Sequence, residues 1–564
     1  MNKQALFHQA NSVWSYIENK SVVTLLFRTS VKDKLQIETV EYNRFYDYNN
    51  RVYHLMRLYL QDELFNYYIT SFIPNHYGCV YYFKISENEE YYFYNEYGLT
   101  KEEPVRLGNY EIPRIQETDV FCAPDFVDSA IFYQIFPDRF NRVGPDDSHF
   151  EKWGSEPTFY NKFGGNFKGV TEKLDYLKTL GVNAIYFTPI TLSHSSHRYD
   201  TIDYMKIDPI LGKSEDFFEL VQKCHEHGIK VIVDAVFNHS SNEFFAFQDV
   251  LAYQKRSKYK NWFLIDQFPV VVRPDKTYQT FGHEPHMPKL NSQNKEVREY
   301  FLKVVRYYML QFKVDGFRLD VADEVDSDFW RMFRKEVKSL NKEALIIGEV
   351  WHNADYYLRG DQFDSVQNYQ FYEVVNRFFV YQKSNLNTFK NEITHLLMMY
   401  PRNVQRALLN QVDSHDTPRI LTLLDGDIKR LRCAVLFQFT YVGMPCIYYG
   451  DEVGLFGDKD PDNRRCYVWN DDTNKKEVFE FYQVITKLRN SESLLQKGDF
   501  RFVHIHEDML SYERYINENF IQIQMNLSDI EIVMSETQEV ILLPHEIKVI
   551  KVEGGIQSTL LEWR

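Results

Sequence analysis

DGFRLDVADE, residues 315–324, is a short hydrophobic run that ends in an acidic cluster. Three further stretches have the same form: VIVDAVFNHS (231–240), ALIIGEVWH (344–352) and ALLNQVDSHDT (407–417). Each is typical of a buried strand whose last residues emerge into a site. Together they bring three carboxylates to separate strand ends, with basic residues beside them: Asp320, Glu349 and Asp416. This arrangement favours glycoside chemistry in a (β/α)8 barrel.

The surrounding sequence alternates between strand and helix patterns. We expect helices at 170–181, 215–228, 294–312 and 327–339, and strands at 129–137, 183–190, 229–237, 314–320, 344–350, 363–367, 406–412 and 445–449. Strands and helices in turn at this spacing indicate parallel β/α units, and eight strands is the number that closes a barrel. We therefore predict an α/β protein with a (β/α)8 barrel over residues 123–490.

Other segments interrupt or flank the predicted barrel. Residues 239–292, after the third strand, form a long connection rich in Tyr, Phe, His and Pro, which predicts a loop subdomain over the face that holds the site. Residues 1–122 predict an N-terminal β-sandwich, from strand-like runs at 22–29, 78–85 and 90–98 with a turn at Gly98. Residues 491–564 predict a C-terminal antiparallel β-sandwich, from runs at 500–507, 509–516, 519–527, 539–544 and 546–552.

Composition argues against several classes of function. The chain has 564 residues and a net charge of −15, which disfavours a nucleic-acid partner because such binding needs a basic face. No apolar run approaches the length of a membrane helix, and the N-terminal segment lacks the apolar core of a secretory signal. The six cysteines are scattered without a CxxC pair, so we expect buried thiols and no disulfide scaffold or zinc site. These features predict a cytoplasmic enzyme without a membrane partner.

Two of the strand ends suggest catalytic carboxyls. Arg318 and Asp320 are two positions apart on one expected strand, so both side chains lie on one face. The guanidinium would keep the carboxylate ionised, as a nucleophile requires, although a structural ion pair fits the same pattern. Glu349 is followed by Trp351, whose ring would desolvate the carboxyl and suit a general acid; a glutamate on the barrel rim is the alternative.

The other two strand ends carry histidines. His415 and Asp416 crowd one of them and could hydrogen-bond sugar hydroxyls, although residues 414–418 also fit a helix N-cap. His239 ends another strand, where a lone histidine is more often structural. The four strand ends together are more informative than any one of them, because all four carry polar groups.

These motifs carry a family resemblance. DAVFNH, GFRLD, GEVW and VDSHDT follow one another as they do in the α-amylase family of glycoside hydrolases, which the chain resembles over essentially its whole length. HRYDTIDY (197–204) and MPKLN (287–291) are similar to the neopullulanase, cyclomaltodextrinase and maltogenic amylase subfamily. IFYQIFPDRF (131–140), FGGNFKGV (163–170) and GDEVGLFGDKDPDNRR (450–465) also fit it, and the N-terminal region resembles that group's starch-binding-like domain.

The resemblance implies a role for each candidate residue. Asp320 would be the nucleophile, Glu349 the general acid/base, and Asp416 the group that stabilises the transition state. By the same resemblance, Arg318, His239 and His415 would hold the sugar at the cleavage position. Tyr199 would stack on that sugar, with His197 beside it. Asp460 and Arg464 would bind further out on the glycone side, and Trp351 would line the acceptor side.

The chain departs from the family pattern at three places. Asn166 stands where relatives often have Asp. The segment after DRF is short beside the family's usual calcium loop, so Asn141, Asp146 and Asp147 are either calcium ligands or a solvated acidic turn, and no other cofactor is expected. Asp323 stands where Asn is common, which would change the acceptor-side preference.

The resemblance implies a retaining hydrolase of α-glucan oligosaccharides. It would cleave α-1,4 bonds in cyclodextrins, maltooligosaccharides, pullulan or starch, and cleavage of α-1,6 bonds as well is an open alternative. Transfer of the glucosyl group to a sugar hydroxyl in place of water is a second outcome. The alternatives are an oligo-α-1,6-glucosidase or transglycosylase of the same family, or a non-catalytic glycan-binding protein. The resemblance also implies a homodimer in which the N-terminal domain covers the neighbour's active site.

Overall fold

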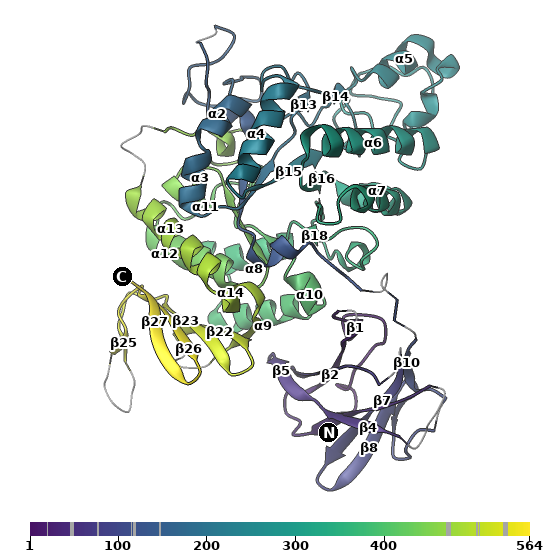
Figure 1. The fold of residues 1–564 in the computed structure, drawn as a ribbon, viewed down its shortest axis with the longest axis vertical. Helices are drawn as coiled ribbons and strands as arrows, with labels where there is room; N and C mark the ends of the chain where they lie inside the picture. Colours follow the sequence, from purple (N-terminus) through teal and green to yellow (C-terminus); the bar gives the residue numbers. More distant parts are fainter. Residues whose placement is uncertain are drawn as a thin grey trace.

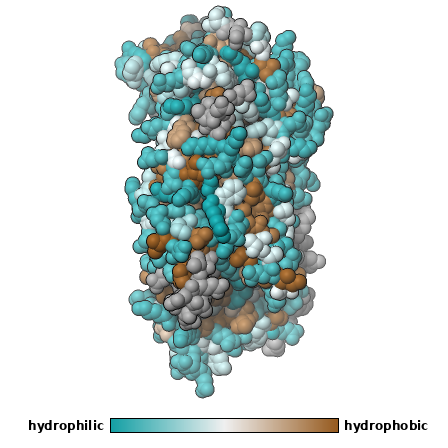
Figure 2. Space-filling model, turned by 90° about the vertical axis from the view of Figure 1, so that its left-hand side faces the viewer, coloured by the Kyte–Doolittle hydropathy of each residue, from teal (hydrophilic) through white to brown (hydrophobic). Residues whose placement is uncertain are grey.

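The computed structural model describes the chain except residues 20, 45–49, 76–77, 106, 114, 117–119, 146–147, 470–474, 504–505, 507 and 534–539. The N-terminal strands, drawn in purple, and the C-terminal strands, in yellow, lie below a central barrel with helices around it (Figure 1). Figure 2 shows one face of the molecule as mainly hydrophilic, with hydrophobic residues scattered over it. Among the described residues, no helix is both long and apolar enough for a membrane span.

The barrel consists of eight parallel strands, at the places the sequence predicts. In spatial order they are β18 (Ser365–Val366), β17 (Leu345–Gly348), β16 (Gly316–Leu319), β15 (Lys230–Ala235), β12 (Ala184–Phe187), β11 (Phe132–Ile135), β20 (Met444–Tyr448) and β19 (Leu409–Asn410). A parallel bridge between Gln367 and Leu409 joins the two ends of this order. The predicted α/β barrel is confirmed.

Helices follow most strands and cover the barrel. They are α2 (Phe167–Glu172) and α3 (Leu174–Leu180), α4 (Ser214–Glu226), α6 (Lys295–Tyr307), α7 (Ser327–Leu340), α8 (Tyr369–Val375) and α9 (Leu386–Leu397), α12 (Ile428–Thr440) and α13 (Lys476–Ser491). The predicted helix at 170–181 is two helices, because the backbone leaves helical geometry at Lys173. The predicted helix at 294–312 continues from α6 through a π-helical turn, Tyr308–Phe312. Only a 3-10 turn, Asp355–Tyr357, follows β17.

The long connection after β15 returns to the strand from which it starts. It contains α5 (Phe245–Tyr253), and its MPKLN segment pairs with residues 238–240, which follow that strand. The amide of Leu290 donates to the carbonyl of Asn238, and that of Ser240 to Pro288. The loop subdomain thereby holds the segment that carries His239.

The N-terminal part is a sandwich of two antiparallel sheets, as predicted. One sheet has the order β1 (Ser15–Ile17), β2 (Val23–Ser30), β6 (Phe65–Phe72) and β5 (Arg57–Gln61). The other has the order β4 (Val52–Leu55), β3 (Gln36–Tyr42), β7 (Cys79–Glu87), β8 (Glu90–Asn95) and β9 (Gly98–Thr100), with β10 (Tyr110–Ile112) on β7. Gly98 begins β9 with a positive φ of 94°, so the predicted run at 90–98 is a hairpin.

The C-terminal part is one larger sheet with a short strand pair. The larger sheet has the order β21 (Asp499–Phe502), β22 (Met509–Ile516), β23 (Asn519–Asn526), β26 (Ile547–Glu553) and β27 (Ile556–Trp563); the pair is β24 (Ile532–Val533) and β25 (Val540–Leu542). The predicted runs at 500–507 and 539–544 extend partly outside the described residues. The exact domain boundaries at 122/123 and 490/491 stay predictions.

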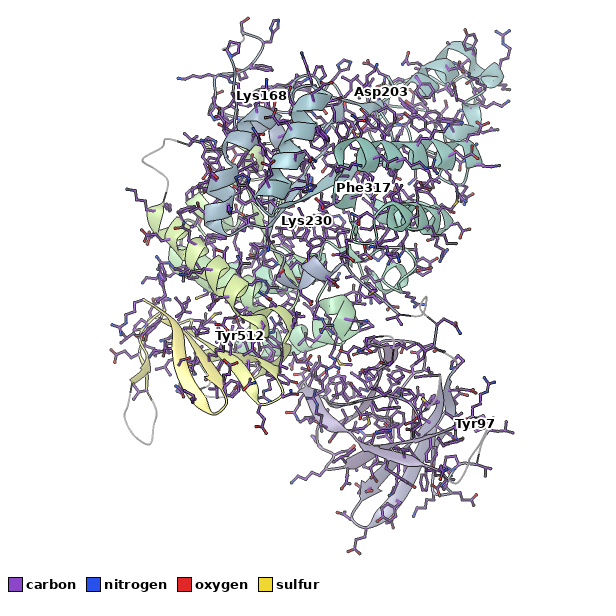
Figure 3. All side chains as sticks on the ribbon, viewed as in Figure 1. Tyr97, Lys168, Asp203, Lys230, Phe317 and Tyr512 are labelled. Atoms are coloured by element: carbon purple, nitrogen blue, oxygen red, sulfur yellow. The ribbon has the colours of Figure 1, made fainter. Side chains whose placement is uncertain are left out.

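Specific side chains join the three parts. Tyr512, which Figure 3 labels in the C-terminal sheet, has its hydroxyl 2.5 Å from that of Thr440 in α12. Arg402 in α10 (Arg402–Gln405) lies 2.6 Å from Glu18 of the N-terminal part and 2.9 Å from Asp499 of the C-terminal sheet. One barrel residue thus contacts both flanking parts.

Candidate active site

Arg318 is the centre of a buried charge cluster. Its Nη1 lies 2.8 Å from Oδ1 of Asp320 and 3.1 Å from Oδ2 of Asp234, and its Nη2 lies 3.0 Å from Oε2 of Glu349. Its Nε donates to Gln367 at 2.9 Å. These partners come from or directly follow the neighbouring strands β15, β16, β17 and β18, so one guanidinium gathers three carboxylates at one end of the barrel.

Asp234 is a member of this cluster that the sequence reasoning missed. It lies on β15 and accepts hydrogen bonds from the hydroxyls of Tyr186 and Tyr199 at 2.9 and 3.0 Å. A charged residue inside the apolar run VIVDAVF was the available signal, because a buried aspartate almost always has a partner. Gln134, Tyr186, Gln367 and Tyr369 were also missed, because an uncharged polar or aromatic residue within or just after a strand carries no comparable signal.

Burial and the neighbouring carboxylates oppose the ionisation of Asp320 and Asp234. Burial raises the pKa of Asp320 well above its ordinary value, and although Arg318 opposes this, Glu349 and Asp234 add to it. Burial likewise raises the pKa of Asp234 to about 6. Arg318 lowers the pKa of Asp320, as the sequence predicts, and the ionised state of this carboxyl stays a prediction.

Glu349 lies against the aromatic wall that the sequence predicts. The Nε1 of Trp351 donates to Oε1 of Glu349 at 3.1 Å, and the amide of Val321 donates to Oε2 at 2.8 Å. The ring of Trp351 stacks on Tyr369 with centroids 3.7 Å apart, yet the residue remains 49% exposed. An indole that is both fixed and exposed can contact a ligand beside the carboxyl.

Tyr199, His415 and Asp416 form the next part of the site. The Nε2 of His415 lies 2.5 Å from the Tyr199 hydroxyl and 3.2 Å from Oδ2 of Asp416, and the rings of His415 and Tyr199 are parallel within 8°. Gln134 lies 2.6 Å from Nδ1 of His415. Asp416 is the most open of the three predicted catalytic carboxylates, with 28% of its side chain exposed.

Two further histidines face the site as neutral rings. Burial lowers the pKa of His197 to about 4 and that of His239 to about 3. The Nδ1 of His197 accepts from the Tyr199 amide at 3.1 Å, and the ring of His239 stacks on Phe281. Burial also lowers the pKa of His415 well below its ordinary value. Neutral imidazoles at pH 7 can donate hydrogen bonds to sugar hydroxyls without adding positive charge.

Arg464 and Asp460 extend the site along the loop after β20. Arg464 lies 3.0 Å from Asp460 and 3.5 Å from Asp416, and its Nε donates to the carbonyl of His415 at 2.9 Å. The structure thus brings together every predicted catalytic and binding residue, and their individual roles stay predictions. Buried Nε2 of His239 and Oδ2 of Asp320 have no hydrogen-bond partner within the described part of the chain, as expected of groups that a ligand completes.

The calcium prediction stays untested. Asp146 and Asp147 lie outside the described residues, and Asn141 donates through its side chain to the carbonyl of Gly169 at 3.0 Å. In the part of the chain that the structure describes, no group of three or more His, Cys, Asp or Glu side chains is placed to hold a metal. Asn166 caps α2 and also donates to the carbonyl of Val143, which an aspartate could not do.

The fold and this site define a glycoside hydrolase, because carboxylates cluster at strand ends of a (β/α)8 barrel. The chain belongs to the α-amylase family. The family model for the alpha amylase catalytic domain matches residues 134–487, and that for the alpha amylase N-terminal ig-like domain matches residues 1–115.

Similar proteins agree with this assignment. The chain is 42% identical to a cyclomaltodextrinase of Thermoanaerobacter pseudethanolicus over 97% of each chain. It is 40% identical to a maltogenic alpha-amylase of Bacillus acidopullulyticus, over 94% of this chain and 92% of the relative. A solved structure named cyclomaltodextrinase matches with a TM-score of 0.90 and 40% identity, covering 95% of this chain and 93% of the other. The family resemblance predicted from the motifs is confirmed.

Proposed function

We propose that this enzyme is a retaining α-glucan hydrolase with Asp320 as nucleophile, Glu349 as general acid/base and Asp416 as stabiliser of the transition state. The observation that carries the proposal is the guanidinium of Arg318, which lies 2.8 Å from Asp320 and 3.0 Å from Glu349. Retaining enzymes hold the two carboxyls about 5–5.5 Å apart, whereas inverting enzymes separate them by about 6.5–9.5 Å to admit water. Two carboxyls on one guanidinium favour the shorter separation.

The reaction proceeds through two displacements. Glu349 transfers its proton to the glycosidic oxygen while Oδ2 of Asp320, which has no hydrogen-bond partner among the described residues, forms a bond to the anomeric carbon. The leaving sugar departs and a β-linked glucosyl-enzyme remains. Glu349 then takes a proton from water, whose oxygen displaces Asp320, and the product regains the α configuration. A sugar hydroxyl in place of water gives transglycosylation.

The proposed substrates are cyclodextrins, maltooligosaccharides, pullulan or starch, by analogy with the relatives' names and the family resemblance. Trp351 is placed to line the acceptor side next to Glu349. Asp323, which stands where Asn is common in the family, lies 3.2 Å from Nε2 of His352, and this pair can change the binding of a sugar on the acceptor side. The two displacements need no cofactor, because side chains supply acid, base and nucleophile. Unchanged activity after dialysis against EDTA would support this and argue against a calcium requirement.

We further propose a cytoplasmic homodimer. All six cysteines are free, as expected in a reducing compartment; five are buried as predicted, whereas Cys122 is exposed. The N-terminal sandwich lies at one end of the molecule, beside the barrel (Figure 1), and offers a surface for a neighbour's site. Light scattering at micromolar protein should give about twice the mass of one chain, and a monomer would contradict the proposal.

Asp320→Asn tests the mechanism. The amide cannot form the glycosyl bond, so turnover of β-cyclodextrin should fall by at least about 10³-fold while the fold persists. Asp328→Asn is the matched control, because Asp328 is exposed on α7 and pairs with Arg331. Full activity of Asp320→Asn would rule out the proposed nucleophile.

A parallel incubation with β-cyclodextrin, pullulan, soluble starch and isomaltose tests the substrate. Fast opening of cyclodextrin to maltose and glucose, with slow starch, supports a restricted site. Fast starch cleavage with cyclodextrin intact would mean an open cleft and would weaken the dimer proposal. Isomaltose as the best substrate would favour an oligo-α-1,6-glucosidase.

A further inference from the structure

Gln134 contacts a catalytic-site histidine from the first barrel strand. It lies on β11 with only 1% of its surface exposed, and its Nε2 is 2.6 Å from Nδ1 of His415. A carboxamide nitrogen carries hydrogens and can only donate. Nδ1 of His415 is therefore an acceptor without a hydrogen, and a neutral ring must carry its proton on Nε2.

The contacts of Nε2 agree with this position of the proton. Nε2 is 2.5 Å from the hydroxyl of Tyr199 and 3.2 Å from Oδ2 of Asp416. The Tyr199 hydroxyl in turn donates to Asp234 at 3.0 Å. Donation thus runs in one direction, from Gln134 through His415 and Tyr199 to Asp234. A proton on Nδ1 would set two hydrogens against each other and leave Asp416 without this donor.

The surroundings of His415 also keep the ring uncharged. The ring is fully buried, and the positive charges of Arg318 and Arg464 oppose a second proton. Burial is the largest cause of its lowered pKa. The ionisable groups that face it come from its own loop and from four other elements: Asp416, Tyr199, His197, Asp234, Arg318 and Arg464.

We propose that Gln134 is a positioning residue that holds His415 as the neutral Nε2–H tautomer. The inference rests on the proposed function, because the transition state is oxocarbenium-like and carries positive charge at the anomeric carbon. A neutral Nε2–H can donate toward Asp416 or a sugar hydroxyl without opposing that charge. A charged imidazolium at the same place would raise the energy of the transition state.

Gln134→Glu tests the proposal with a side chain of the same shape. A carboxylate accepts from Nδ1–H, so it would reverse the tautomer or stabilise the imidazolium. We expect kcat on β-cyclodextrin at pH 7 to fall at least about tenfold with KM within about threefold, because a wrong tautomer impairs an otherwise intact site. The pH profile of kcat should also gain an ionisation between about pH 5 and 8.

Asn183→Asp is the matched control. It also replaces an amide by an acid, but beside the end of β11 that is opposite to Gln134. There Asn183 accepts from the amide of Ile131 at 2.7 Å and donates to the carbonyl of Ser129 at 2.8 Å. It should keep the wild-type pH profile even if it lowers stability. The same new ionisation in Asn183→Asp would overturn the proposal.

Gln134→Met provides a second variant if Gln134→Glu does not fold. It removes the donor without adding charge, so kcat should fall several-fold with no new ionisation, at a wild-type melting temperature. Wild-type kcat in Gln134→Met, or a wild-type profile in folded Gln134→Glu, would overturn the role of Gln134. Failure of the proposed function would look different, because the wild-type enzyme itself would not turn over cyclodextrin.

Discussion

Nη1 of Arg318 lies 2.8 Å from Oδ1 of Asp320, and the two residues are two positions apart at one strand end. The contact alone would be an ordinary ion pair. Its importance comes from the other groups on the same guanidinium, because Asp234 and Glu349 lie within 3.1 Å of it. Arg318 therefore orients the proposed nucleophile and the proposed acid at once.

Arg318→Lys should disable this arrangement without removing the charge. A lysine has no planar fork and cannot serve three carboxylates and Gln367 together. Losing one or two charge-assisted hydrogen bonds, each about 1.5–3 kcal/mol, should lower kcat/KM on β-cyclodextrin by about 10²-fold or more. Arg334→Lys, at the pair with Asp364, should stay near wild type. Activity of Arg318→Lys within twofold of wild type would refute the shared-guanidinium account.

Trp351 should control the fate of the glucosyl-enzyme. Its ring stacks on Tyr369 and is half exposed, so it can hold an acceptor sugar. Trp351→Ala should lower the ratio of transfer to hydrolysis on maltotriose several-fold, as measured by product chromatography. Trp351→Phe keeps an aromatic face but loses the 3.1 Å hydrogen bond to Glu349, so the ratio should change less. An unchanged ratio in Trp351→Ala would exclude this role.

Acid should destabilise the fold through buried histidines. Burial lowers the pKa of His8 and His239 to about 3 and of His197 to about 4, below the ordinary value of about 6.5. The unfolded chain then binds more protons from about pH 6.5 down to these values. Each histidine therefore lowers the free energy of unfolding by about 1.4 kcal/mol per pH unit as the pH falls through this window. Asp234 has a raised pKa, so its protonation increases the free energy of unfolding as the pH falls from about 6 to 3.8.

His8→Gln isolates one of these contributions. His8 lies in the N-terminal sandwich, between the carbonyl of Leu26 and the hydroxyl of Tyr81, and glutamine can serve both without titrating. Urea unfolding at pH 7.0 and 4.5 should show a smaller loss of stability in His8→Gln than in wild type. Equal losses would show that His8 is not held neutral.

Arg402→Ala should loosen the junction of the three parts. Arg402 lies between Glu18 and Asp499 with 14% of its side chain exposed, so the substitution removes the cation that both carboxylates share and leaves Asp499 only the longer, 3.7 Å pair with Arg57. We expect about 3 kcal/mol lower stability in urea unfolding, and faster proteolysis between the N-terminal sandwich and the barrel. Arg359→Ala is the control, because its pair with Asp355 is exposed and should contribute little. Equal stability of the two variants would contradict a role for Arg402 at this junction.

Local patterns in the sequence were enough to predict the barrel. Its strands are short apolar runs bounded by turns, and burial of both faces makes such runs visible without any contact information. The motif residues at their ends, such as Asp320 and Glu349, could be predicted because strand ends meet at one face of a barrel. β27 was missed because most of Ile556–Trp563 is exposed and lacks a hydrophobic alternation.

The sequence by itself determined the eight-stranded barrel, the order of its motifs and the carboxylates at their ends, because these depend on periodicity and spacing along the chain. Tertiary structure alone decided which groups share a guanidinium or a hydrogen bond. Asp234 and Arg318 are 84 residues apart and Gln134 and His415 are 281 apart, yet each pair meets within about 3 Å. Charge and tautomer follow from such contacts and from burial, and neither can be read from neighbours in the chain.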